Sequence, residues 1–198
     1  MSIRSLTENE IQSMQSGNIW SEDCPLHHSR LRVVEIKYFG FDDYEHSSTM
    51  IVLDSISEQV KLIFEELFSV AFPIYSIVPM EQFKGDDVAS MEANNSSAFN
   101  GRRIMNTDRW SSHAYGCAID INPAQNPYML LDKKQAKINV FPSSAIDYVN
   151  RNSIRKGMVE PIVQIFEKHG FTDWGGGWVH KPDYHHFQLP WESIHKLV

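Results

Sequence analysis

The chain has 198 residues, of which 42% are hydrophobic and 22% are charged, and these proportions exclude a disordered or coiled-coil protein. Its formal net charge of -7 argues against nucleic acid as the main partner, because phosphate binding needs clustered Lys and Arg, and the densest basic group is Arg102-Arg103. The length fits one domain over 1–198, which we expect.

No segment suggests export or insertion into a membrane. The first nine residues lack the basic and then apolar pattern of a signal peptide, and no apolar run approaches about 18 residues. No repeat, low-complexity tract or linker marks a domain boundary. Cys24 and Cys117 allow at most one disulfide, so cysteine usage leaves the redox compartment open.

Two capping-box pairs predict helices in the first third of the chain. Thr7 with Glu10 is one, and Ser55 with Glu58 is the second and the stronger prediction. After Ser55, apolar residues recur at helical spacing and the run ends before Pro73, which predicts a helix with one buried face. The residues expected on this face are Val60, Ile63, Phe64, Leu67 and Phe68.

A third helix is expected near 157–169. Pro161 is tolerated in a first helical turn, and Gly170 is a typical C-terminal stop. Its buried face would carry Ile162, Val163 and Phe166.

Three short segments with β-branched or aromatic residues between turn formers predict strands. They are Arg32–Phe39, Cys117–Ile121 and His185–Leu189. We therefore predict an α+β fold in which helices pack on a small antiparallel sheet. Two long irregular segments remain, 83–112 and 122–145, and loops of that length often shape a cleft.

The first motif runs from Ser111 to Asp120. A hydrolytic zinc typically takes three ligands from neutral imidazole and carboxylate, and His113 and Asp120 supply one of each. In a strand, Ala118 and Asp120 would lie on the same face. Gly116 permits a bend in the backbone that can bring His113 to that face. Taken alone, a His followed seven residues later by an Asp is also typical of a surface pair or a core histidine.

The second motif, Asp183-Tyr184-His185-His186, strengthens the prediction of a metal site. Successive side chains of a strand alternate faces, so His185 and His186 cannot both bind one metal without a bulge. We choose His186 as the third ligand, and we expect His185 to be a surface histidine or a neighbour of the ligands. Asp183 would then be the carboxylate that moves protons.

The pattern Ser-x-His-x-x-Gly-x-Ala-x-Asp at 111–120, followed by Asp-x-x-His at 183–186, resembles the zinc D-alanyl-D-alanine carboxypeptidase family. That family includes D-Ala-D-Ala dipeptidases and the L-alanoyl-D-glutamate endopeptidases of phage lysins. Residues 95–102, 120–128 and 174–178 also resemble its carboxypeptidase-like branch. The resemblance covers roughly 83–190, and residues before about 45 carry none.

Carried over to this chain, the resemblance implies one Zn²⁺ held by His113, Asp120 and His186, with Asp183 as general base and acid. Arg102 falls where the family has an arginine that stabilises the oxyanion, and the adjacent Arg103 is its competitor. The implied substrate is a peptidoglycan stem peptide, cut by a carboxypeptidase-like activity. An L-Ala-D-Glu endopeptidase is the alternative within the enzymes.

A rival from another class is a non-catalytic zinc-containing binding domain on the same scaffold, as in the hedgehog signalling domains. The chain also departs from many relatives in having Tyr184 where they have a histidine and Gly101 where they often have a cysteine. Asp183 stands where the dipeptidases typically have Glu. Three further residues are candidate substrate contacts, each with a plainer structural alternative as a turn cap or core aromatic: Ser111, Trp174 and Trp178.

Overall fold

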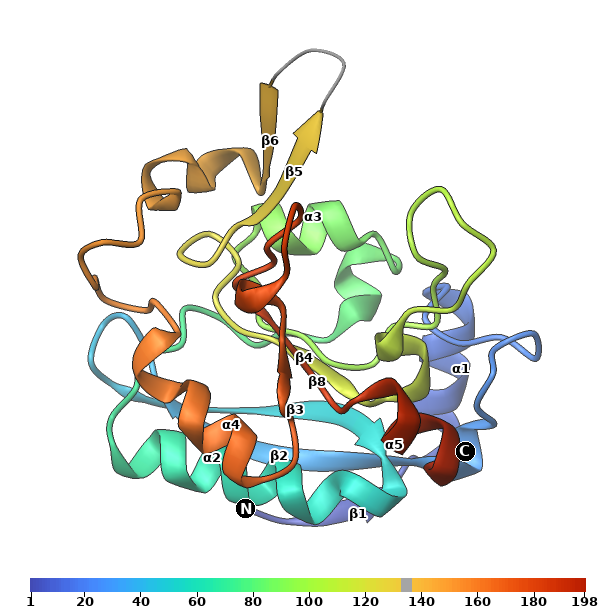
Figure 1. Cartoon of the computed structure of the whole chain (residues 1–198). Helices are drawn as coiled ribbons and strands as arrows, with labels where there is room; N and C mark the ends of the chain where they lie inside the picture. Colours follow the sequence, from blue (N-terminus) through green and yellow to red (C-terminus); the bar gives the residue numbers. More distant parts are fainter. Residues whose placement is uncertain (133–136) are drawn as a thin grey trace.

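The computed structural model describes residues 1–132 and 137–198 as a mixed α/β structure (Figure 1). Its helices are α1 (Glu8–Ser16), α2 (Ser57–Ser69), α3 (Asp87–Glu92), α4 (Val163–Lys168) and α5 (Trp191–Leu197). Its strands are β1 (Ile3–Ser5), β2 (Leu31–Phe39), β3 (Glu45–Leu53), β4 (Ala118–Asp120), β5 (Tyr128–Asp132), β6 (Lys137–Phe141), β7 (Asp173–Trp174) and β8 (His186–Gln188). The predicted α+β class, with small antiparallel sheets, is confirmed.

The N-terminal half builds a three-stranded antiparallel sheet in the order β1-β2-β3. Helix α2 packs on β2, and α4 packs on α2. In the view of Figure 1, α2 runs below this sheet, while β4 and β8 lie above it. The N-terminal sheet is therefore the base on which the segments with the two motifs rest.

A second antiparallel sheet, in the order β4-β8-β7, carries parts of both motifs. Asp120 is directly opposite His186, and Ile119 is opposite Phe187. Because side chains alternate along a strand, His186 and Asp120 share one face and Ile119 and Phe187 share the other. The apolar face joins the core, where the ring of Phe187 stacks on that of Phe166 with 3.9 Å between centroids.

The three predicted strands agree with β2, β4 and β8 to within one residue at each end. The helix predicted from Thr7 is α1, and its capping box is formed: Thr7 Oγ1 accepts from the Glu10 amide, and Glu10 Oε2 accepts from the Thr7 amide. Helix α2 buries most of the predicted face, although Phe68 is only half-buried, against Phe39.

The capping box predicted for Ser55 and Glu58 is wrong, although its helix exists. A 3₁₀ turn, Asp54–Ile56, precedes α2, and the helix starts without a side-chain cap. The carboxylate of Asp54 accepts from the Ser55 amide and pairs with Arg30. This turn removes Ser55 from the extended conformation that a capping residue adopts.

The third predicted helix is shorter than expected. A 3₁₀ turn over Glu160–Ile162 contains Pro161, and only Val163–Lys168 is α-helical. Gly157 has a φ of +83° and Gly170 a φ of +92°, both in the left-handed region that favours glycine. The segment 157–159 is therefore a turn, while the predicted stop at Gly170 agrees with the structure.

The prediction of an irregular segment over 122–145 agrees with the structure at 122–127 and is wrong for the strands that follow. Strands β5 and β6 form an antiparallel hairpin, which projects at the top of Figure 1. A 3₁₀ turn follows at Ser143–Tyr148, and residues 133–136 lie outside the described part. The other segment, 83–112, is irregular apart from its 3₁₀ beginning and α3.

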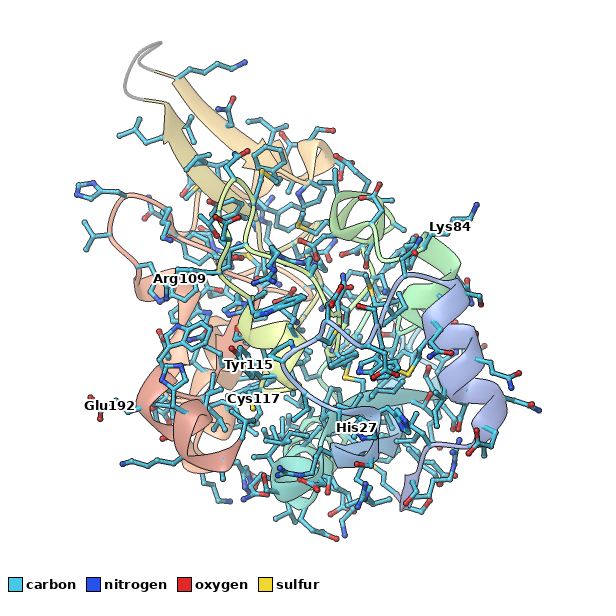
Figure 2. The ribbon with its side chains drawn as sticks, turned by 90° about the vertical axis from the view of Figure 1, so that its right-hand side faces the viewer. His27, Lys84, Arg109, Tyr115, Cys117 and Glu192 are labelled. Atoms are coloured by element: carbon cyan, nitrogen blue, oxygen red, sulfur yellow. The ribbon has the colours of Figure 1, made fainter. Side chains whose placement is uncertain are left out.

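Among the described residues, no helix combines the length and the apolar run that crossing a bilayer requires. Cys24 and Cys117 are both free. Cys117 is buried, and this burial raises the pKa of its thiol to about 12. In Figure 2, Cys117 and Tyr115 lie inside the fold, whereas Lys84 and Glu192 extend outward.

The turn of the first motif is joined to the N-terminal sheet at Gly116. Its φ is +64°, its carbonyl accepts from the Leu53 amide, and an added Cβ would lie 2.5 Å from the Leu53 nitrogen. Both the conformation and the contact exclude a side chain.

We expect Gly116→Ala to lower the free energy of unfolding by about 2–4 kcal/mol, measured by urea denaturation.

Gly177→Ala is the matched control, because nothing lies within 4 Å of the Cβ it would add. That variant should stay within about 0.5 kcal/mol of the parent. Equal stability of the two variants would contradict the proposed constraint at Gly116.

Candidate metal centre and its cavity

Three buried side chains bring their donor atoms together between the two motifs. Nε2 of His113 lies 3.2 Å from Oδ2 of Asp120 and 3.2 Å from Nδ1 of His186. That Nδ1 lies 3.0 Å from Oδ1 of Asp120. Each side chain is at most 8% exposed. The structure thus unites the three residues that the sequence nominated as ligands.

Strand pairing and a tight turn account for this convergence. Asp120 and His186 are cross-strand partners on the same face of the second sheet. His113 comes from the 3₁₀ turn Ser112–Tyr115, which Gly116 ends in a left-handed conformation. The chain therefore reverses just after His113, which brings its ring to the face that carries Asp120.

Each histidine has its outer ring nitrogen occupied by a fixed acceptor. Nδ1 of His113 lies 2.5 Å from the Ala98 carbonyl oxygen, so this nitrogen carries the proton and donates it. Nε2 of His186 lies 2.9 Å from Oε1 of Gln188 and donates to it in the same way. Both tautomers leave the inner nitrogen with a free lone pair, the arrangement that metal-binding histidines usually have.

The arrangement fits a zinc ion. Zinc bonds of about 2.0–2.1 Å in tetrahedral geometry separate neighbouring donor atoms by about 3.3 Å. Here the two inner nitrogens of His113 and His186 are 3.2 Å apart, and each lies 3.0–3.2 Å from one of the two carboxylate oxygens of Asp120. Two imidazoles and one carboxylate also suit zinc better than magnesium or calcium, which prefer oxygen ligands. The group can therefore hold a metal without rearrangement.

Asp183 borders this cluster and is paired with His185. Nε2 of His185 lies 2.9 Å from Oδ1 of Asp183, and its Nδ1 donates to the Asn126 carbonyl at 2.7 Å. His185 is 3% exposed and buried beside the ligands, so the surface alternative for it is wrong. Oδ1 of Asp183 is buried without an aligned hydrogen-bond donor among the described residues. This oxygen can still accept a proton or a hydrogen bond.

The charges of the cluster shift its pKa values. Burial alone would favour neutral Asp120, but His113 and His185 outweigh burial and hold the pKa of Asp120 well below its usual range. Burial also opposes protonation of His185, but Asp183 and Asp120 outweigh it and raise the pKa of His185 to about 10. The two carboxylates that flank His185 therefore favour its protonated form.

A cavity of about 420 Å³ opens beside the cluster. Arg102 lines it, and an ion pair with 2.7 Å between its Nη2 and Oδ2 of Asp87 joins the two side chains. The guanidinium of Arg103 instead lies 3.6 Å from the centre of the Trp110 ring, outside the set of residues that line the cavity. Of the two adjacent arginines, Arg102 is therefore the one that lies at the cavity.

The surrounding loops and strands complete the walls. Arg109 lies on the same side of the molecule as α5 in Figure 2, and its guanidinium faces the Trp191 ring at 5.9 Å. Both residues line the cavity. The base of the β5–β6 hairpin contributes Tyr128 and Phe141, whose rings stack. A groove large enough for part of a peptide therefore borders the donor cluster.

The three candidate substrate contacts take different positions. Ser111 caps the 3₁₀ turn by accepting from the His113 amide at 3.3 Å, and it also lines the cavity. Trp178 lines the cavity, and its ring centre lies 5.3 Å from that of His186. Trp174 packs on Phe187 and is not among the described residues that line the cavity. Its structural alternative, as a core aromatic, is the one observed.

Sequence reasoning missed the residues that support the ligands. Gln188 accepts from His186, and its own amide donates to Asp173 at 2.9 Å. The other oxygen of Asp173 accepts from Trp178 at 2.7 Å. The spacing of two between His186 and Gln188 in a strand was a usable signal, because it places both on one face. No local pattern pointed to Asp173.

A comparison with protein-family models matches residues 105–189 to a family described as D-alanyl-D-alanine carboxypeptidase. A search of curated proteins and a search of solved structures each found no match. The matched segment includes His113, Asp120, Asp183 and His186, and Arg102 lies just before it. The predicted resemblance is therefore confirmed for the segment that holds the donor cluster, which matches a peptidase family, the D-alanyl-D-alanine carboxypeptidases.

Proposed function

We propose that the protein is a zinc peptidase that hydrolyses a peptide bond in peptidoglycan stem peptides, with a D-alanyl-D-alanine carboxypeptidase activity. The observation that carries the proposal is the buried cluster of two histidines and one aspartate, whose donor atoms lie within 4.8 Å of one another in the segment that matches the peptidase family. His113, Asp120 and His186 would hold the metal. Their outer hydrogen bonds support this role, since they fix both imidazoles in the metal-binding tautomer.

When bound, zinc lowers the pKa of a water molecule to about 7 and polarises a carbonyl group. Asp183 takes a proton from the attacking water and passes it to the nitrogen of the leaving amine. His185, whose Nδ1 donates to the Asn126 carbonyl, pairs through Nε2 with the Asp183 carboxylate at the edge of the cavity. Arg102 donates from the cavity wall to the substrate oxygen that gains negative charge.

Two alternatives to a carboxypeptidase are a non-catalytic binding domain and an endopeptidase, and the structure bears on them differently. A binding domain on the same scaffold needs neither a proton-carrying carboxylate nor an arginine, yet Asp183 and Arg102 both line the cavity beside the donors. This favours an enzyme. An endopeptidase would use the same catalytic residues and differ in the bond that it cuts, so the product identifies it.

We expect about one zinc per chain in protein purified at neutral pH, measured by elemental analysis. The zinc-loaded protein should release D-alanine from a stem pentapeptide, detected by mass, and a chelator should abolish this activity.

Mild acid should remove the metal, because protons compete with it for His113 and His186. His113→Ala should lose zinc, whereas His46→Ala, an exposed histidine paired with Asp42, should keep it.

Other products would redirect the proposal. A cut between L-alanine and D-glutamate would identify the endopeptidase, and zinc-loaded protein without any cleavage would indicate the binding domain. Absence of zinc from the wild type would contradict the metal site itself.

The roles of the two carboxylates can be separated. Asp183→Asn should keep zinc while its activity falls by about 10² to 10⁴, the usual contribution of a positioned acid or base. Asp120→Asn should instead weaken zinc binding, because it replaces a charged ligand by a neutral amide. Zinc titration and turnover on the same preparations test both. Loss of zinc from the Asp183 variant alone would exchange the two roles.

The oxyanion role is tested at the two adjacent arginines. Arg102→Ala should lower kcat by about 10² to 10³ without loss of zinc, because the donor acts mainly in the transition state. Arg102→Lys should recover little, since an ammonium lacks the planar pair of donors. Arg103→Ala, which removes a guanidinium stacked on Trp110, should stay within a few-fold of the parent. Equal losses at both positions would refute the assignment.

A further inference from the structure

The ion pair between Asp87 and Arg102 lies in the wall of the cavity that contains the donor cluster. Oδ2 of Asp87 is 2.7 Å from Nη2 of Arg102, and the two side chains are 27% and 28% exposed. Asp87 is the first residue of α3, while Arg102 lies on the loop that leads to the first motif. At the edge of the site, the pair therefore joins the start of α3 to the loop that leads to the first motif.

Hydrogen bonds hold the backbone at Gly101 and Arg102 in place, but they do not determine where the long side chain of Arg102 points. The Gly101 amide donates to the Ile19 carbonyl at 2.8 Å, and the Arg102 carbonyl accepts from the Ser111 amide at 3.1 Å. Among the described residues, the guanidinium has one polar contact besides Asp87, a long hydrogen bond of 3.5 Å from Nη1 to the Arg103 carbonyl. The direction of the guanidinium therefore depends on Asp87.

The guanidinium keeps donors available after it has paired with Asp87. Nε of Arg102 is buried and has no hydrogen-bond partner among the described residues. A buried donor without a partner is rare in folded proteins, and such atoms are often explained by a ligand. One end of the group is thus paired with a carboxylate, while Nε has no partner among the described residues.

We propose that Asp87 is a positioning residue, which holds the guanidinium of Arg102 in the direction needed to stabilise the charge that develops on the substrate oxygen. The inference rests on the proposed function. An arginine side chain has many rotamers, and an ion pair with 2.7 Å between Nη2 and a carboxylate oxygen favours those that keep the guanidinium beside Asp87. Asp87 thus acts on the reaction through Arg102 alone.

The main test is Asp87→Asn, which removes the charge at nearly constant volume. We expect kcat to fall about 10- to 100-fold with KM nearly unchanged, as when a group that supports a catalytic residue is lost. Zinc content should stay at the parent value. The melting temperature should change by no more than about 2 °C, because partly exposed ion pairs contribute little to stability.

The neighbouring Asp86 offers a matched control. It caps α3 by accepting from the Ala89 amide at 3.1 Å and is not paired with Arg102. Asp86→Asn removes the same charge from the same helix end and keeps a good cap, so kcat should stay within about two-fold. In an Arg102→Ala background, Asp87→Asn should have no further effect on kcat.

Three kinetic results would overturn the proposal. Equal kcat for the Asp87 and Asp86 variants would show that the pair does not matter. The same loss with and without Arg102 would show that Asp87 acts independently of it. A higher kcat in Asp87→Asn would show that the carboxylate competes with the substrate for Arg102.

A measurement without substrate separates this inference from the proposed function. Hydrogen exchange at Nε–H of Arg102, assigned by its loss in Arg102→Lys, should be faster in Asp87→Asn than in Asp86→Asn. If the wild type cleaves no stem peptide, the proposed function fails, and this measurement still decides whether Asp87 fixes Arg102. Equal exchange in both variants would overturn the inference.

Discussion

The candidate site depends on the register between β4 and β8. Asp120 faces His186 only because Ile119 faces Phe187 on the opposite side of the same strands. A shift by one residue would turn the two ligands into the core and two large apolar side chains toward the cavity. The stacking of Phe187 on Phe166 opposes such a shift. Hydrophobic packing on one face of the sheet therefore specifies the polar arrangement on the other.

Residues before the family-matched segment position two of the three candidate ligands. Ser97 exchanges backbone hydrogen bonds with Asp120, at 2.8 and 3.0 Å, and the next carbonyl, that of Ala98, accepts from His113. The same stretch pairs with the N-terminal sheet through the Phe99 amide and the Ile51 carbonyl. The β1–β2–β3 sheet is thus a support for the site as well as a part of the fold.

Sequence patterns identified the helices, strands and motifs whose signal lies in neighbouring residues. Apolar strands such as Arg32–Phe39 and the spacing of the two motifs were readable, whereas β3 was missed because its first half, Glu45–Thr49, is polar and carries no buried residue. The β5–β6 hairpin carries no Asn-Gly or Asp-Gly signal in its described part. The partnership of Asp87 with Arg102 was unreadable, because it depends on how a loop is anchored by distant backbone groups.

The hydrogen bonds on the outer nitrogens of His113 and His186 also bear on how the protein acquires its metal. Both acceptors, the Ala98 carbonyl and Gln188, belong to the folded framework and keep the inner nitrogens aimed at one point. Small zinc domains, by contrast, gain their fold from the ion. For the metal proposed here, we expect folding to come first and metal binding second, so removing the ion should leave an intact receptor that can be reloaded. Maturation of the proposed enzyme would then be governed by metal supply rather than by a folding step.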